Sequence, residues 1–193
     1  MNVYSSVDLL GKEIAQNNEK KLGLRSLAKS FIESYRRTVS LNIQIPTNVF
    51  LRTKQLCAYI ESEVGVRFDL SNFIMALYLD FINSSIVKHD ISTIFKILSK
   101  NNYTHNIKIV CGGDVWEGPL STDSTTELII SMKKDDVLRG ELLLAEIDDL
   151  YNYVLSIEET LSIIWVTFIR NYLKESNKKT LNAIINILRN SLI

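Results

Sequence analysis

The chain has 193 residues, and its 46% hydrophobic and 23% charged residues are the balance of a globular protein rather than a disordered one. Equal numbers of basic and acidic side chains, 22 of each, argue against a broad nucleic-acid-binding coat. No apolar run approaches the roughly 18 residues of a membrane span, the N-terminus has no signal-peptide pattern, and the two cysteines make no disulfide or metal framework. We therefore expect a cytoplasmic protein without a cofactor, made of one large or two small domains.

The charges are distributed unevenly along the chain. Residues 1–100 carry 13 basic and 9 acidic side chains, whereas residues 101–193 carry 9 and 13. Within the second half, residues 111–160 hold 12 acidic and 3 basic side chains. Because phosphates are attracted to basic surfaces, any nucleic acid is expected at the first half, and the second half should avoid it.

The first segment predicts two helices separated by a polar run. Apolar residues at helical spacing mark one helix from Val7 to Ile14 and another from Leu24 to Tyr35. A helix-turn-helix is the competing interpretation, but no short turn joins the two pieces. We therefore expect an N-terminal helical extension over residues 1–37.

The next stretch alternates strictly between apolar and polar residues. The apolar positions are Val39, Leu41, Ile43 and Ile45, and the polar positions are Thr38, Ser40, Asn42 and Gln44. This period of two predicts a strand with one face on a core and the other in solvent. Pro46 ends the strand because it has no N–H to donate.

Two amphipathic helices are predicted directly after this strand. The first has Val49, Thr53, Leu56, Ile60 and Val64 on one face and ends at Gly65, and the second follows Asp69 as N-cap with Leu70, Phe73, Ile74, Leu77 and Phe81 on one face. One strand and two helices bury too little apolar area to fold alone. A lone strand also leaves an unpaired edge, so the segment predicts a homodimer in which two copies of the strand pair.

The order of these residues resembles the ribbon-helix-helix (MetJ/Arc-type) DNA-binding family. The resemblance rests on the alternating strand Ser40–Ile45, on Pro46 after it and on the helix start Asp69–Ile74, and it covers residues 38–83, about a quarter of the chain. In that family, strands from two subunits pair antiparallel and enter the DNA major groove. Their inward residues join the core of a four-helix dimer, and three alternating outward residues read base edges.

The resemblance implies roles for particular residues. The base readers are Ser40, Asn42 and Gln44, and the phosphate contacts are Arg36, Arg37, Asp69, Leu70, Ser71 and Asn72. Asn and Gln carboxamides pair with adenine N6 and N7, and a good bidentate pair contributes about 1–3 kcal/mol of discrimination. Free N–H groups at a helix start bind phosphate and fix the register of the protein on DNA.

The rest of the chain predicts a mixture of helices and strands. Another helix is expected from Asp90 to Lys100, followed by a boundary, and then strands at 106–111, 127–132 and 137–147. The third strand would carry a bulge at Gly140, and residues 133–136 would form a polar turn. Two further helices are marked by Leu161, Ile164, Trp165, Phe168, Ile169 and Tyr172, and by Leu181, Ile184, Ile185, Leu188 and Leu192.

This second half is weakly similar to small sensor domains of the GAF/PAS sort. Trp116 and the loop 113–126 are a candidate mouth for a small ligand, although packing at a core or rim is favoured for a tryptophan near a glycine turn. Oligomerisation or recruitment of a basic protein partner is the other role that we expect for this half.

The sequence does not predict a catalytic centre. His89 and His105 lie among polar residues, where a solvent-exposed role is favoured. Cys111 with His105 is the only conceivable nucleophile–base pair, and a buried cysteine at a strand end is favoured over it. The acidic pairs at 135–136 and 148–149 lack the pattern of a calcium loop and are interpreted as solvated turns. We therefore do not expect an enzyme.

The expected fold is α+β and mostly α. It divides into an N-terminal helical extension (1–37), a ribbon-helix-helix dimer module with the following helix (38–100), and a C-terminal α+β domain of a few antiparallel strands plus two helices (101–193). The expected function is sequence-specific binding of double-stranded DNA by a homodimer, with tetramers on DNA left open, as a transcriptional repressor or a plasmid or phage DNA-site accessory protein. The alternative is an interaction or small-ligand sensor protein that does not bind DNA, in which residues 38–83 form one layer of a mixed fold.

Overall fold

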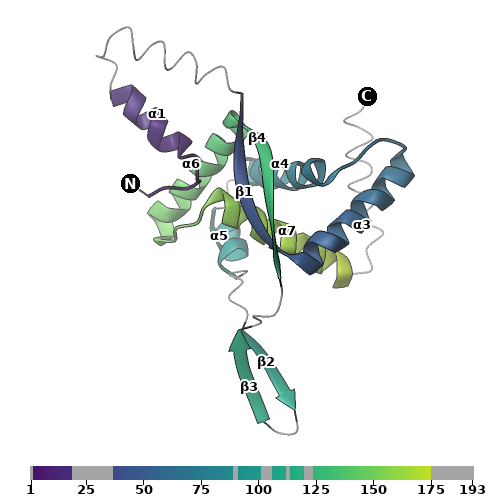
Figure 1. Ribbon diagram of the computed structural model, residues 1–193. Coiled ribbons are helices and arrows are strands. Elements are labelled where there is room, and N and C mark those ends of the chain that lie inside the picture. The colour runs from purple at the N-terminus through teal and green to yellow at the C-terminus, as the bar shows by residue number, and fades with distance from the viewer. Residues whose placement is uncertain are drawn as a thin grey trace.

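The computed structural model describes residues 2–18, 37–88, 91–100, 106–111, 114–119 and 124–174. It is an α+β fold that is mostly helical, as predicted (Figure 1). The elements are α1 (Leu9–Asn18), β1 (Thr38–Pro46), α3 (Thr47–Val64), α4 (Leu70–Lys88), α5 (Ile91–Lys100), β2 (Asn106–Cys111), β3 (Asp114–Pro119), β4 (Thr125–Lys133), α6 (Lys134–Tyr151) and α7 (Ile157–Lys174).

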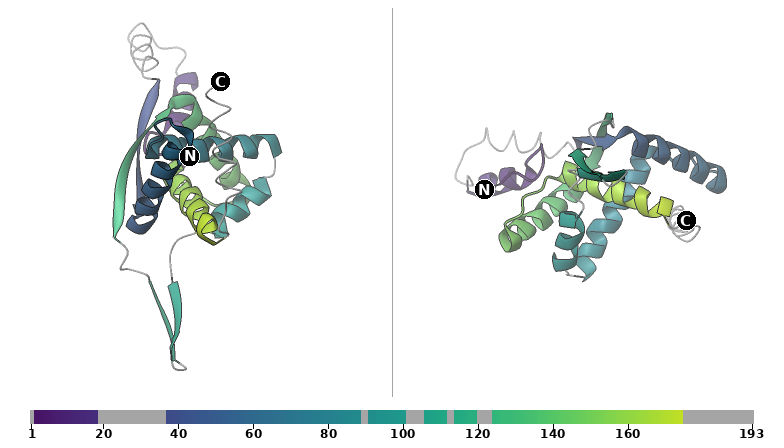
Figure 2. Two further views of the ribbon diagram at one scale, coloured as in Figure 1. Left: turned by 90° about the vertical axis from the view of Figure 1, so that its right-hand side faces the viewer. Right: turned by 90° about the horizontal axis from the view of Figure 1, so that it is seen from below.

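The central sheet consists of β1 and β4, which pair antiparallel over nine residues each. Helices α3, α4, α6 and α7 lie on one face of this two-stranded ribbon, and its other face is left open by the part of the chain that the structure describes (Figure 2). We expected a second copy of β1 to pair along this edge. The structure instead pairs β1 with β4 of the same chain, so the unpaired edge from which we argued for a homodimer is filled within one chain.

The chain contains two strand–helix–helix units of nearly identical dimensions. The second unit repeats the first at a constant shift of 87 positions, from 38 to 125 for the strands, from 47 to 134 for the first helices and from 70 to 157 for the second helices. In both units the first helix follows its strand without a connecting residue. We call two residues related by this shift counterparts, for example Asn42 and Ile129.

The connections between the helices repeat as well. Gly65 and its counterpart Asn152 end the first helices in the left-handed conformation, at φ 72° and 51°. The next helices are capped by the residues just before them, Asp69 and its counterpart Ser156, whose side chains accept backbone N–H groups of Asn72 and Glu159 at 3.0 and 3.1 Å. The same local chemistry therefore directs the chain at both turns.

The packing of the helices follows the same relation. Trp165 of α7 donates a hydrogen bond from Nε1 to Thr53 Oγ1 of α3 at 2.7 Å. The counterparts of these two residues are Tyr78 and Gly140, and the space where a Cβ of Gly140 would lie is occupied by Tyr78 Oη. The Tyr78 hydroxyl donates to the backbone oxygen of Asp136 at 2.9 Å. Each second helix thus crosses the first helix of the opposite unit through an aromatic residue at the same position.

One hydrophobic core joins the two units. Buried residues from both sides of the expected boundary near residue 100 form a single cluster that runs from Tyr4 to Ile169 and includes Leu41, Ile43, Ile45, Ile130 and Met132 of the ribbon. The segment 38–100 therefore shares its core with residues of the expected C-terminal domain.

The N-terminus is fixed to α6 by a buried carboxylate. Glu141 is fully buried, and it accepts hydrogen bonds from the hydroxyl of Ser5 and from the backbone N–H groups of Leu9 and Leu10, the last at 2.6 Å. A negative charge at the start of α1 also complements the helix dipole. The sequence predicted α1 from its apolar spacing but not this contact.

The segment between the two units holds α5 and a second two-stranded sheet, in which β2 and β3 pair antiparallel. This hairpin projects away from the helices (Figures 1 and 2). β2 has the predicted bounds, whereas β3 forms inside residues 113–126, where we expected a loop.

The largest error of sequence interpretation is α6. We expected a strand at 137–147, but the segment is helical and buries Val137, Gly140, Glu141, Leu144 and Ile147 on one face. The glycine and the glutamate interrupt the apolar stripe and hide its helical period. The acidic pairs at 135–136 and 148–149, expected as turns, lie in the first and last turns of this helix.

Some predicted features lie outside the described residues. These are the helices at Leu24–Tyr35 and Leu181–Leu192, together with Arg36, His89, Asp90 and His105. Among the helices that the structure describes, none has the length and apolar character to cross a membrane.

Candidate nucleic-acid interface

The open face of the ribbon carries the three residues that we expected to read bases. Ser40, Asn42 and Gln44 of β1 are exposed, and the residues between them, such as Ile43, are fully buried. The alternation of polar and apolar residues thus directs three short polar side chains to one surface. Whether they contact bases stays a prediction.

β4 contributes a second row of side chains to the same face. Glu127, Ile129 and Ser131 are exposed, and they are the counterparts of Ser40, Asn42 and Gln44. Ile129 is 76% exposed, which is unusual for a large apolar side chain in the middle of a strand.

The two rows face each other across the ribbon. Ser40 pairs with Ser131, Asn42 with Ile129, and Gln44 with Glu127. The Gln44 amide donates from Nε2 to Glu127 Oε1 at 3.1 Å. Asn42 is therefore opposite its own counterpart, which places a pseudo-two-fold axis between Asn42 and Ile129.

The outer edge of β1 is partly covered by α7. Lys134 N donates to Arg37 O and Thr47 N to Ser124 O, so the odd-numbered residues of β1 exchange hydrogen bonds with β4. The even-numbered residues direct their backbone groups to the other edge. There the Ser162 hydroxyl of α7 donates to Gln44 O at 2.8 Å.

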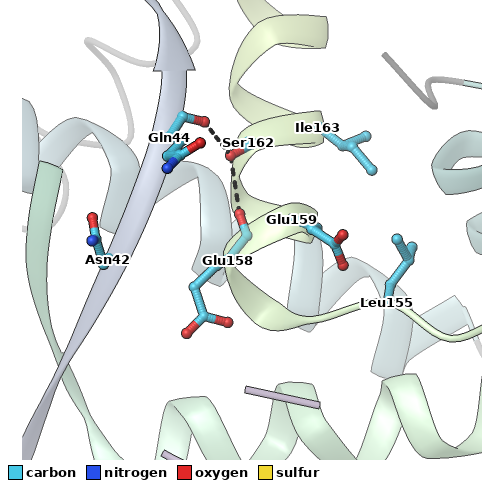
Figure 3. Close-up of a pocket in the computed structure, with 7 residues that line it drawn as sticks. All are labelled: Asn42, Gln44, Leu155, Glu158, Glu159, Ser162 and Ile163. Carbon is cyan, nitrogen blue, oxygen red and sulfur yellow. Dashed lines mark hydrogen bonds between the residues drawn. The ribbon is translucent and has the colours of Figure 1, made fainter. Parts of the chain in front are cut away.

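A groove of about 380 Å³ lies between this edge and the start of α7 (Figure 3). It is lined by Asn42, Gln44, Leu155, Glu158, Glu159, Ser162 and Ile163. The Glu159 carboxylate accepts from Ser156 N and Oγ at 2.8 and 3.0 Å, and the Glu158 carboxylate accepts from Ser6 N at 3.0 Å. The start of α7 is thus capped by Ser156 and Glu159, whereas Glu158 binds the N-terminal segment. Both carboxylates lie in the groove and disfavour a phosphate there.

The start of α4 is the counterpart of this position and has a different charge. Asp69, Ser71 and Asn72 are exposed, and Leu70 is half-buried. Asp69 is the predicted N-cap, and its carboxylate already accepts the Asn72 N–H. Ser71 and Asn72 replace the two glutamates of α7, and the exposed Arg67 lies in the connection just before the helix.

Basic side chains gather at one end of the ribbon. Arg37 precedes β1, Lys133 ends β4 and Lys134 begins α6 beside it, with Lys134 N donating to Arg37 O at 3.0 Å. Arg37 and Lys133 are exposed. Asp135 and Asp136 of α6 follow directly and offset part of this charge.

Of the two cysteines, Cys57 of α3 is the one whose side chain the structure describes. Burial, and secondarily Asp69 and Glu61, raises the pKa of the Cys57 thiol to about 12, so this side chain is a neutral core residue. Cys111 lies in β2, but the side chains of Cys111 and His105 are outside the described residues.

Half of this surface, the row on β4, is not predicted from the sequence. We predicted the strand that contains Glu127, Ile129 and Ser131 but assigned it to a separate domain. The signal that identifies these residues is the repeat of element lengths, which was hidden when α6 was interpreted as a strand. Only ten of 51 aligned counterparts, from Thr38 with Thr125 to Lys88 with Glu175, are identical, among them Ile43 with Ile130 and Phe81 with Phe168.

No family model, no curated protein and no solved structure matches the chain.

Proposed function

We propose that the chain is a sequence-specific double-stranded DNA-binding protein and that its two units form a ribbon-helix-helix arrangement within one polypeptide. In this proposal the β1–β4 ribbon enters the major groove. The two strands that the family takes from two subunits are both supplied by one chain.

The observation that carries the proposal is the agreement between the repeat and the strand pairing. The shift that superimposes the two units maps Asn42 onto Ile129, and these two residues also face each other in the ribbon. In the ribbon-helix-helix family, two subunits each supply one strand and two helices, and the helices meet in one core. The resemblance of residues 38–83 implies this arrangement, and here the two units of one chain have the same relation. The exposed row on β1 adds the polar side chains that base recognition requires.

The chemistry of the open face supports contacts with bases and with phosphates. Asn42 and Gln44 offer carboxamides for adenine, and Ser40 offers a hydroxyl as donor or acceptor. Arg37, with Arg36 beside it in the sequence, supplies positive charge next to the start of the ribbon. The exposed start of α4, at Ser71 and Asn72, is the better of the two helix starts for a phosphate.

The expected homodimer takes a different form in this proposal. One chain carries a complete ribbon and is the unit of recognition, and two chains side by side on DNA would correspond to a tetramer in the family. The biological role that we propose is transcriptional repression or marking of a plasmid or phage DNA site. Both roles require a short operator and a rigid reading surface.

A second candidate is an interaction surface for a protein. The 76% exposure of Ile129 and the two carboxylates in the adjoining groove favour a partner that presents an apolar and a basic side chain. This function needs no DNA, and the experiment that follows separates it from the first.

The purified full chain should enrich a short sequence from a random duplex library at moderate salt. Asn42→Ala should then weaken binding to the enriched duplex by about tenfold, since one good base contact contributes about 1–3 kcal/mol. Binding is measured by fluorescence anisotropy. Gln55→Ala, which removes an exposed carboxamide from α3, is the matched control and should bind as the parent does.

The DNA-binding proposal fails if no sequence is enriched over the input library, or if Asn42→Ala and Gln55→Ala bind every duplex as the parent does. The protein-interaction candidate then gains support.

A further inference from the structure

We infer that the chain reads an asymmetric DNA site, in which the half contacted by β1 and the half contacted by β4 differ in sequence and in how the backbone is held. This inference rests on the proposed function. It follows from three differences between positions that the pseudo-two-fold axis makes equivalent.

The first difference is the chemistry of the two reading rows. A two-fold symmetric ribbon presents the same side chains to both halves of a site, and such a protein reads an inverted repeat. Here Ser40 corresponds to Glu127, Asn42 to Ile129 and Gln44 to Ser131, so no reader is repeated. The two rows cannot select the same bases.

The side chains on β4 indicate what the second half of the site contains. An exposed aliphatic side chain such as Ile129 packs on the methyl group of thymine, and a carboxylate such as that of Glu127 accepts from N4 of cytosine. The carboxamides of Asn42 and Gln44 favour adenine instead. The hydrogen bond from the Gln44 amide to the Glu127 carboxylate links the two rows near the end of β1. It holds the amide donor of Gln44 beside the carboxylate acceptor of Glu127.

The second difference is the charge at the two ends of the ribbon. Arg37, Lys133 and Lys134 lie where β1 begins, whereas Glu127, Glu158 and Glu159 lie around Gln44, where β1 approaches its end. At the basic end, Asp135 and Asp136 follow these cations in the first turn of α6, and Asp136 forms an ion pair with Arg139 at 3.8 Å. Among the described residues that line the groove at the acidic end, none is basic.

The third difference is the start of the second helix in each unit. Ser162, in the second turn of α7, bonds to Gln44 O, so the start of α7 lies at the acidic end. The pseudo-two-fold relation assigns the start of α4 to the opposite, basic end, and Tyr78 of the same helix bonds to Asp136 O just beyond β4. A phosphate is therefore less disfavoured beside α4, where Asp69 caps the helix but Arg67 lies close by, than beside α7, where Glu158 and Glu159 repel it.

The test compares the sequences that parent and symmetrised chains enrich from the same random duplex library. The triple variant Glu127→Ser/Ile129→Asn/Ser131→Gln gives β4 the readers of β1. The reciprocal variant Ser40→Glu/Asn42→Ile/Gln44→Ser gives β1 the readers of β4. All six positions are exposed, and circular dichroism with a thermal melt checks that each variant folds.

We expect the parent to enrich a sequence without an inverted repeat, and to bind an inverted repeat of either half about tenfold or more weakly than the enriched site. We expect each variant that folds to enrich an inverted repeat, and the two repeats to correspond to the two halves of the parent's site.

Three results would overturn the inference. If the parent enriches an inverted repeat, or if a folded symmetrised variant keeps the parent's sequence, the asymmetry is wrong while DNA binding stands. If the parent enriches no sequence, the inference fails together with the proposed function.

Discussion

Glu141 is the residue on which the position of the N-terminus depends. It is fully buried in α6, and its two carboxylate oxygens receive the Ser5 hydroxyl and the first free N–H groups of α1. A buried carboxylate is tolerated only when hydrogen bonds replace its hydration, and three donors do so here. The Glu141 side chain, which belongs to α6, thus caps the start of α1.

Glu141→Ala should lower the free energy of unfolding by about 3 kcal/mol, because it leaves the donors at Ser5, Leu9 and Leu10 buried without an acceptor. Urea unfolding followed by circular dichroism measures this loss. Glu146→Ala removes an exposed carboxylate from the same helix and is the control, with an expected change within about 0.5 kcal/mol. An equal effect of the two substitutions would show that the buried cap contributes nothing.

At the scale of elements, the crossing of α4 over α6 depends on the absence of a side chain at Gly140. A Cβ there would lie 2.1 Å from Tyr78 Oη and 2.5 Å from Ile157 Cδ1. At the other crossing, of α7 over α3, there is room for Thr53, whose hydroxyl accepts from Trp165. The two crossings use counterpart positions, but the Thr53 hydroxyl comes from the first helix of a unit and the Tyr78 hydroxyl from the second helix of a unit.

Gly140→Ala should therefore destabilise the protein, although alanine is favoured over glycine by about 1 kcal/mol in an ordinary helix interior. Overpacking against Tyr78 costs about 1–3 kcal/mol, so a net loss is expected in a thermal or urea melt. Combining it with Tyr78→Phe, which removes the obstructing oxygen, should cost less than the sum of the two single losses. A stabilised Gly140→Ala protein would contradict this packing.

The sequence predicted the elements whose patterns are local and unbroken. β1 was recognised because every second residue is apolar, and α3 and α4 because their stripes are continuous and end at Gly65 or begin at Asp69. The apolar pattern does not predict α6, because Gly140 and Glu141 interrupt its buried stripe. Gly140 leaves space for Tyr78, and Glu141 accepts hydrogen bonds from the start of α1. Both residues are explained by tertiary contacts, which cannot be predicted from the neighbouring sequence alone.

The candidate surface was predicted in the same partial way. Exposure of Ser40, Asn42 and Gln44 follows from the alternation of β1 alone. The facing row on β4 depends on which strand pairs with β1, and the pairing was not deducible without the repeat. Because the repeat was not recognised, we expected a dimer in which each chain supplies one strand, whereas one chain contains both strands.

At the scale of the whole molecule, the two units share one core and neither buries its apolar face alone. Inward residues of both strands, such as Ile43 and Ile130, meet helices from both units in a single cluster. Joining the units in one chain removes the dependence of folding on protein concentration that a dimer has. It also lets the two halves of the open face diverge, because a substitution changes only one of them.

The measurement that tests the central claim most directly is DNA binding by a chain whose own two strands are covalently linked. Thr38 and Lys133 face each other at an exposed, non-hydrogen-bonded position of the ribbon, where Cα atoms lie about 4.5 Å apart and a disulfide can form. The protein carries Thr38→Cys and Lys133→Cys in a Cys111→Ser background, and its reduced form is the control for the lost lysine.

We predict that oxidation links the two cysteines within one chain of 22.1 kDa, independently of protein concentration, and that the oxidised monomer binds the enriched duplex within about twofold of the reduced form. A disulfide that forms only between chains, or an oxidised monomer that no longer binds the duplex, would contradict the claim that one chain supplies both strands of the ribbon that reads DNA.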